Sequence, residues 1–168
     1  MKLRLVQPKL RRAWELRRGD EVVATLRIPL LRRSAEIEIG DRKLALERSG
    51  LIGNSVAVRD TVTGEERMRI GRESLRRVLE LGGQRTEWRS LGWGSTYGFV
   101  GPDGEPLVRG KVSQGITRTN GDIEVADSLP EDESLLAAAL TAYLLIRRAE
   151  DNASAAAGSV AATSGGAG

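Results

Sequence analysis

Apolar and polar residues alternate with a period of two along most of the chain, in short segments separated by glycine-containing connections. AEIEIG (residues 35–40), for example, places its alanine and both isoleucines on one face and its glutamates on the other. This alternation is typical of β-strands with one buried face. About eleven or twelve such segments occur before residue 128, joined by connections such as TGE, GGQ, PDGE and TNGD, whose glycines suit tight turns. No strand–helix–strand alternation is present, so the pattern predicts a mainly β protein and disfavours a parallel sheet.

One segment fits two structures. GRESLRRVLELGG (residues 71–83) spaces Leu75, Val78 and Leu79 as a helix would, and Gly82 could end that helix. The strand alternative is favoured for Val78–Leu81, because VLELGGQRTEWR makes a compact hairpin.

The most apolar segment is SLLAAALTAYLLIRR (residues 134–148), and its flanking charges predict a helix over about residues 129–148. The acidic PEDE precedes it and Arg147 and Arg148 follow it, which is the arrangement that the helix dipole favours. Its apolar part would extend about 18 Å as a helix, against about 30 Å for the hydrocarbon core of a bilayer. The segment is therefore too short to be transmembrane.

This helix also lacks a polar face, since leucines and Tyr143 form one side and Ala138, Thr141 and Ala142 lie on the other. A helix that is apolar all round is expected to be buried all round. In a chain of strands, the inside of a closed barrel offers that environment. We therefore predict a closed antiparallel barrel of about twelve strands around one buried hydrophobic C-terminal helix, formed by residues 1–150. Residues 151–168 are rich in Ala, Gly and Ser and are predicted to form a disordered tail.

Composition excludes several kinds of chemistry. The chain contains no cysteine and no histidine, which removes disulfides, Cys/His metal sites, cysteine nucleophiles and histidine-based triads. Its many carboxylates alternate along strands without a distinctive pair, and no S-x-x-K motif occurs. We predict no catalytic residue, no cofactor and no metal site, and hence a protein that is not an enzyme. No apolar run follows the basic N-terminus, so a cytoplasmic protein is expected.

Positive charge is concentrated at one end of the chain. The formal net charge is +3, but residues 1–18 contain seven Lys or Arg side chains and only one acidic side chain. Such a region could attract anionic partners. The favoured explanation is a strand with arginines on its solvated face, and whether the region binds a partner is left open.

The order of elements resembles that of the tubby C-terminal-like fold, which includes tubby domains, LURP-one-related proteins and phospholipid scramblases. The segments that carry the resemblance are AWELRRGDEVVATLRI, VLELGGQRTEWRS, GFVGPDGEPLVRGKV and LLAAALTAYLLI, in that order. In the fold that it resembles, the last helix passes through the barrel. The resemblance covers about residues 1–150 and lies in order and pattern.

The resemblance also implies a lipid-binding hypothesis. Tubby domains bind phosphoinositide head groups through spaced Lys and Arg on the barrel exterior, and Arg109 and Lys111 share one face of a strand here. Three functions are considered. The first is a non-catalytic binding or scaffold module of unknown ligand. The second is a protein that binds anionic phospholipid at the membrane periphery. The third and weakest is binding of single-stranded nucleic acid, a partner that the pattern does not favour.

Four aromatic residues lie close together in the sequence: Trp88, Trp93, Tyr97 and Phe99. They could form a stacking platform or a lipid-contacting rim. Alternation places Tyr97 and Phe99 on one face and favours packing in the core for both, whereas Trp93 lies in a glycine-rich connection and is expected to be the most exposed.

Overall fold

In a computed structural model of the chain, twelve antiparallel strands form a closed barrel around one C-terminal helix. The structure describes residues 1–8, 12–29, 34–49, 55–73, 76–92, 94–114 and 119–163. The elements, in chain order, are β1 (Lys2–Val6), β2 (Ala13–Arg18), β3 (Glu21–Arg27), β4 (Ser34–Ile39), β5 (Arg42–Ser49), β6 (Ser55–Asp60), β7 (Glu66–Glu73), β8 (Arg76–Leu81), β9 (Gln84–Ser90), β10 (Thr96–Val100), β11 (Pro106–Gln114), β12 (Thr119–Val125) and α1 (Glu131–Thr163).

The strands form a simple meander that closes on itself. Each strand pairs with its neighbours in the sequence, and β1 pairs with β12 over Lys2↔Glu124 to Val6↔Asn120. The strand predicted at Val78–Leu81 is confirmed as part of β8, and Leu75 lies outside the described residues. The predicted fold class is therefore correct.

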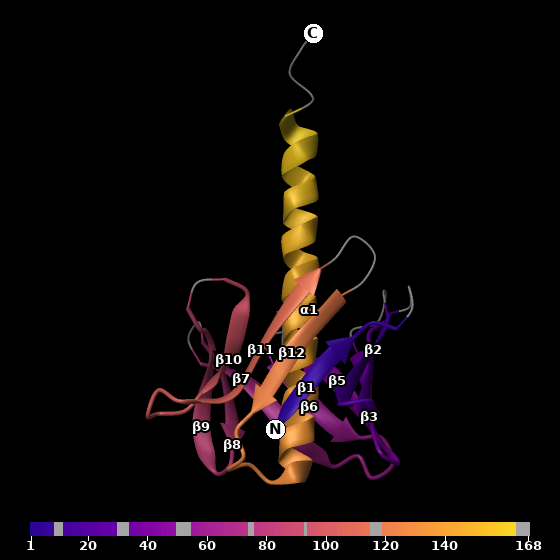
Figure 1. Cartoon of the computed structure of the whole chain (residues 1–168), viewed down its shortest axis with the longest axis vertical. Helices are drawn as coiled ribbons and strands as arrows, with labels where there is room; N and C mark the ends of the chain where they lie inside the picture. Colours follow the sequence, from indigo (N-terminus) through magenta and orange to yellow (C-terminus); the bar gives the residue numbers. More distant parts are fainter. Residues whose placement is uncertain are drawn as a thin grey trace.

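The helix α1 fills the barrel, as its lack of a polar face predicted. Every residue from Leu136 to Ile146 is buried, and Leu140 and Thr141 have no exposed surface. The leucines and isoleucines of the strands pack around it from their inward-facing positions. Figure 1 shows α1 passing through the ring of strands and continuing beyond it.

The strands approach one another and α1 most closely where side chains are absent. A Cβ atom on Gly98 of β10 would collide with the carbonyl oxygen of Val108 on the neighbouring strand. A Cβ atom on Gly110 of β11 would lie 2.9 Å from Cδ1 of Leu145, so this glycine lets the helix pack directly against the strand backbone.

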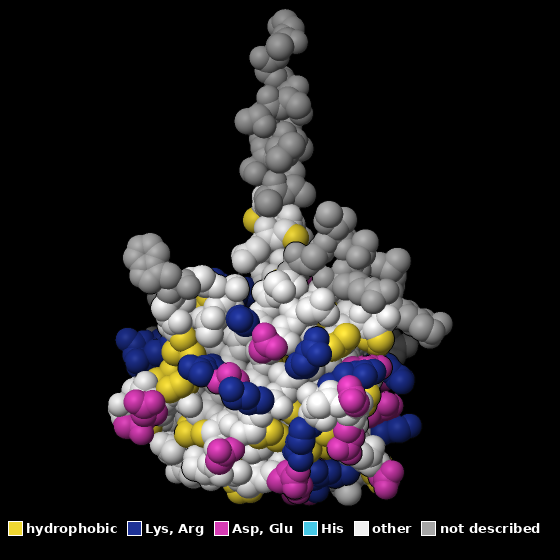
Figure 2. All heavy atoms as spheres, in the orientation of Figure 1, with side chains coloured by type: hydrophobic (Ala, Val, Ile, Leu, Met, Phe, Trp, Pro, Cys, Tyr) yellow, Lys and Arg dark blue, Asp and Glu magenta, His cyan; other side chains and the backbone are white. Residues whose placement is uncertain are grey.

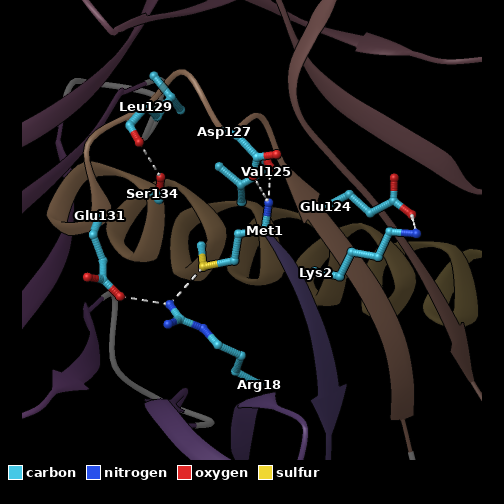
Figure 3. Close-up of polar contacts among 9 residues, drawn as sticks. All are labelled: Met1, Lys2, Arg18, Glu124, Val125, Asp127, Leu129, Glu131 and Ser134. Carbon is cyan, nitrogen blue, oxygen red and sulfur yellow. Dashed lines mark hydrogen bonds and ion pairs between the residues drawn. The ribbon is translucent and has the colours of Figure 1, made fainter.

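The two ends of the barrel differ in how the helix passes through them. Around the end where α1 begins, the entry mouth, Met1 donates from its ammonium group to the Val125 carbonyl at 2.7 Å and to Asp127 Oδ1 at 2.6 Å (Figure 3). Arg18 of β2 pairs with Glu131 at 3.0 Å. These contacts hold the first strands, the end of β12 and the first turn of α1 together.

At the opposite end, the exit mouth, the helix does not stop. α1 continues to Thr163, beyond the end near residue 148 that the charge pattern suggested, and its last turn contains no basic residue. Arg147 and Arg148 lie where the helix leaves the barrel but are not at its C-terminus, so the dipole explanation for them is wrong. The continuing segment is rich in alanine, the residue with the highest helix propensity. The tail predicted over residues 151–168 overlaps this helical segment as far as Thr163, and residues 164–168 lie outside the described residues.

Candidate functional site

Clefts are present at both mouths of the barrel, and their charges differ. The cleft at the entry mouth has a volume of about 500 Å³ and lies between the first turn of α1 and strands β5, β7 and β8. Its basic and acidic side chains neutralise one another, since Arg42 pairs with Asp132 at 3.3 Å and Arg69 pairs with Glu66. This cleft therefore has no strong preference for either sign of charge.

The cleft at the exit mouth is strongly basic. It has a volume of about 430 Å³, and the described residues that line it include five arginines and one carboxylate, that of Asp151. We call it the arginine cleft, and define it by Arg48, Arg72, Arg77, Arg147, Arg148 and Trp88.

Strand alternation explains why three of these arginines face the cleft. On β5 the buried Leu44 and Leu46 face the helix, and Arg48 is the next residue in the same inward-facing row. On β7 the buried Met68 and Ile70 are followed in the same way by Arg72, and on β8 Arg77 precedes Leu79 and Leu81. Since side chains at every second position share one face, these rows turn from apolar to cationic where they reach the exit mouth.

Helical spacing supplies the other two arginines. Tyr143, Arg147 and Asp151 are four residues apart, and so are Leu144, Arg148 and Asn152. Residues at this spacing lie on one side of a helix, and all six line the arginine cleft. The cleft therefore lies between one side of α1 and the ends of β5 to β9.

Like charges are brought close together in this cleft. Arg72 and Arg77 are direct cross-strand partners in the β7–β8 pair, an arrangement that is unfavourable for two cations. Burial lowers the pKa of the Arg77 guanidinium, the positive charges of Arg48 and Arg72 lower that pKa further, and Tyr143 and Asp151 oppose the effect. Within the described residues, no carboxylate forms an ion pair with Arg48, Arg77 or Arg148.

The contacts of Arg147 leave one donor unused. Its Nη1 donates to Glu150 Oε2 at 3.2 Å, and the other oxygen of Glu150 accepts from Arg12 Nη2 at 2.6 Å. The Nε atom of Arg147 is buried and has no hydrogen-bond partner among the described residues. An unpaired buried donor is unfavourable.

One aromatic residue of a cluster, Trp88, lines the arginine cleft. Trp88 of β9 packs on Phe99, at a ring-centroid distance of 4.9 Å, and on Tyr97, at 5.9 Å. The Arg148 guanidinium lies 4.2 Å above the Tyr97 ring. Phe99 is fully buried and Tyr97 is partly buried against the core, as alternation predicted, and Trp93 lies outside the described residues.

The two residues selected from the sequence as lipid ligands, Arg109 and Lys111, lie elsewhere, on the outer face of β11. Arg109 Nε donates to Glu124 Oε2 at 2.8 Å, a bond that lowers the pKa of Glu124. Lys111 Nζ lies 3.8 Å from Asp122 on β12. Basic and acidic side chains alternate across this exterior (Figure 2). Each candidate thus has an acidic neighbour, and lipid binding by this pair stays a prediction.

The basic N-terminal region is largely neutralised by acidic neighbours. Lys2 lies 3.7 Å from Glu124, Arg12 pairs with Glu150, Arg17 pairs with Glu15 and Arg18 pairs with Glu131; Lys9 and Arg11 lie outside the described residues. This supports the explanation that most of these side chains are the solvated face of barrel strands.

Sequence reasoning missed the arginine cleft, although a signal for it exists. Alternation was used to assign apolar residues to the interior, and it was not extended to the arginines at the strand ends. Following the inward-facing rows past their last apolar residue would have placed Arg48 and Arg77 beside the helix.

The remaining observations concern other kinds of site. Within the described ranges, no group of three or more acidic side chains is arranged to hold a metal ion. Over its described residues, α1 contains no stretch that is both long and apolar enough to cross a bilayer. No family model, curated protein or solved structure matches the chain.

Proposed function

We propose that the protein is a non-catalytic binding module that holds a phosphate-type anionic ligand in the arginine cleft. The observation that carries this proposal is the convergence of five arginines on a cleft with one lining carboxylate. Planar guanidinium groups bind the oxygens of phosphates and carboxylates in pairs, which makes clustered arginines effective receptors for oxyanions. The volume of about 430 Å³ lies within the range of small-molecule sites.

The side chains of the cleft support binding rather than catalysis. Arginine stays protonated and cannot exchange protons near neutral pH. Asp151 and Tyr143 are the other titratable groups that line the cleft, and Tyr143 is buried. A single carboxylate beside several arginines lacks the paired acid and base of a hydrolytic site.

The order of strands and helix supports a relationship to tubby-like barrels, in which a phosphorylated lipid head group would be one source of the anion. The same guanidinium chemistry accepts a soluble phosphate compound. The neutralised exterior around Arg109 and Lys111 favours the arginine cleft over that surface as the anion site. A cytoplasmic location, with or without contact to a membrane, belongs to this proposal.

Calorimetric titration with pyrophosphate tests the proposal. The wild type should bind, and Arg77→Gln should weaken binding at least tenfold, because a charge-assisted hydrogen bond is lost and the cleft becomes less positive. Arg109→Gln removes the same charge from the outer face of β11 and is the matched control, with affinity expected within twofold of wild type.

Two results would contradict the proposal: no binding of pyrophosphate by the wild type at low salt, or equal losses in both variants. Sedimentation with vesicles of phosphatidylcholine, with and without phosphatidic acid, identifies the source of the anion. Binding to the acidic vesicles that Arg77→Gln abolishes would indicate a lipid head group, and binding of pyrophosphate alone would indicate a soluble ligand.

A further inference from the structure

Trp88 contributes an aromatic ring to the lining of the arginine cleft, which also includes five arginines. Trp88 continues the inward-facing row of β9 that contains the buried Thr86, and it reaches the exit mouth at the level where β5, β7 and β8 present arginines. Phe99 and Tyr97 pack against the indole. The lining of the cleft thus contains an aromatic ring beside its cations.

Arg148 adds a second planar group to the same space. Its guanidinium is held over the Tyr97 ring at 4.2 Å, and the residue lines both the arginine cleft and an adjoining cleft of about 430 Å³. Guanidinium planes stack on flat rings as well as binding phosphates. Arg148 is therefore placed where a ligand could use either property.

Inorganic phosphate would use the arginines and leave the indole surface unused. A flexible aliphatic chain has no flat face to match it. A molecule that joins a phosphate to an aromatic ring would use both parts of the cleft. Stacking of a base on an aromatic side chain strengthens binding by roughly tenfold or more and tolerates different bases, because every base has a π-face.

We propose that the ligand of the arginine cleft is a nucleoside phosphate, with its phosphate held by Arg77, Arg147 and their neighbours and its base stacked on Trp88. This inference rests on the proposed function, since it requires the cleft to bind phosphate. It adds the class of molecule that carries the phosphate. A free nucleotide and the 5′-phosphorylated end of a single strand share this chemistry.

The deciding comparison is between AMP and ribose 5-phosphate, which have the same phosphate and sugar and differ only in the base. By calorimetry, wild-type protein should bind AMP about tenfold more tightly than ribose 5-phosphate. Trp88→Leu should lower the affinity for AMP to that for ribose 5-phosphate, and Trp88→Tyr should retain most of the preference. Circular dichroism establishes that each variant is folded. If Trp88→Leu does not fold, the wild-type comparison alone decides.

The binding measurements distinguish failure of this inference from failure of the proposed function. If the wild type bound AMP and ribose 5-phosphate with equal affinity, the inference of a nucleoside phosphate would be wrong, and the proposed function as an anion-binding module would be unaffected. Absence of binding for both compounds and for pyrophosphate would overturn the proposed function as well. A preference for AMP that Trp88→Leu leaves unchanged would also overturn the assignment of the base to Trp88.

A 5′-phosphorylated tetranucleotide and its unphosphorylated counterpart separate the two sources of the ligand. Tighter binding of the phosphorylated strand than of AMP would support a strand end, and weaker binding would support a free nucleotide. If the unphosphorylated strand binds as well as the phosphorylated one, the terminal 5′-phosphate is not recognised and a strand end is not the ligand.

Discussion

Arg48, Arg72 and Arg77 occupy inward-facing positions that leucine, isoleucine or methionine fill one step deeper in the barrel. Their guanidinium groups share one cleft, and Arg72 and Arg77 face each other across paired strands. Like charges placed directly opposite each other destabilise a sheet. Residues that lower stability at one place are common at binding sites, where function and stability compete. The cleft is expected to reduce the stability of the unliganded protein.

Replacing Arg77 by glutamine should therefore stabilise the unliganded protein. We expect Arg77→Gln to raise the free energy of unfolding by roughly 0.5 kcal/mol at low salt, the scale of a cross-strand charge interaction, and this gain should shrink as added salt screens the charges. Urea denaturation measures both effects. Arg76→Gln is the control, because the adjacent Arg76 pairs with Glu87 at 3.1 Å and loses an attractive contact instead. If Arg77→Gln were less stable than Arg76→Gln, repulsion between Arg77 and the other arginines of the cleft would not explain the result.

At this scale the sequence could predict the face on which a residue lies but not its depth along the barrel. Alternation placed Ile37, Ile39 and Phe99 in the core correctly. Whether Arg48 lies at a mouth or on the wall depends on how far each strand extends beside its neighbours and beside α1. These offsets depend on the register of each strand pair and on the position of α1 inside the barrel, so the site could not be predicted from local pattern alone.

The helix α1 differs from the helices of most soluble proteins, which bury one side and expose the other. Over three turns it buries every side chain, and it does so because the strands surround it. Its apolar segment and its position could be predicted from the sequence. Its end could not, because Arg147 and Arg148 have the composition of a helix C-terminus while the alanines beyond them favour continuation.

A charge placed in the middle of α1 should prevent folding. Leu140 is completely buried, and an unpaired carboxylate in an apolar interior costs several kcal/mol or more, a large part of the typical total of about 5–15 kcal/mol. Leu140→Asp should lose its native circular dichroism spectrum and its cooperative thermal transition.

Two controls make this result specific to burial in the helix. Leu140→Met changes shape more than volume and should cost less than about 1.5 kcal/mol. Val62→Asp introduces the same charge at a position that is 88% exposed and should stay folded. If Leu140→Asp kept a native spectrum and the stability of Val62→Asp, the helix would not be enclosed.

Across the whole molecule, carboxylates accept hydrogen bonds that favour their ionised form. Asp60 accepts from the backbone N–H groups of Thr63 and Val62, and these bonds lower its pKa. Bonds from arginines lower the pKa values of Glu66, Glu87 and Glu124 in the same way. A carboxyl group whose pKa is lower in the folded than in the unfolded state stabilises the fold above its unfolded pKa. This contribution is lost as the pH falls through the folded value.

The free energy of unfolding should therefore be nearly constant between about pH 8 and 5 and should decrease as the pH falls below about 5. Urea midpoints measured at intervals between pH 7 and 3 check this. Asp60→Asn can still accept the two turn hydrogen bonds but does not titrate, so its midpoint should decrease less steeply with acid than that of the wild type. If the urea midpoints of the two proteins fell in parallel with pH, Asp60 would not contribute to the loss of stability in acid. If the midpoint of the wild type did not change with pH, none of the four carboxylates would contribute.

The pairing of β1 with β12 has a consequence for synthesis. The ring of strands closes only when residues 2–6 meet residues 120–124, and α1 follows directly in the chain. A nascent chain that ends before residue 131 has strands whose leucines face an unfilled interior, and pairing across such long separations is slow. Partly completed strands with exposed apolar faces are prone to aggregation. The barrel is therefore expected to fold only after α1 has left the ribosome, and until then the growing chain exposes apolar strand faces.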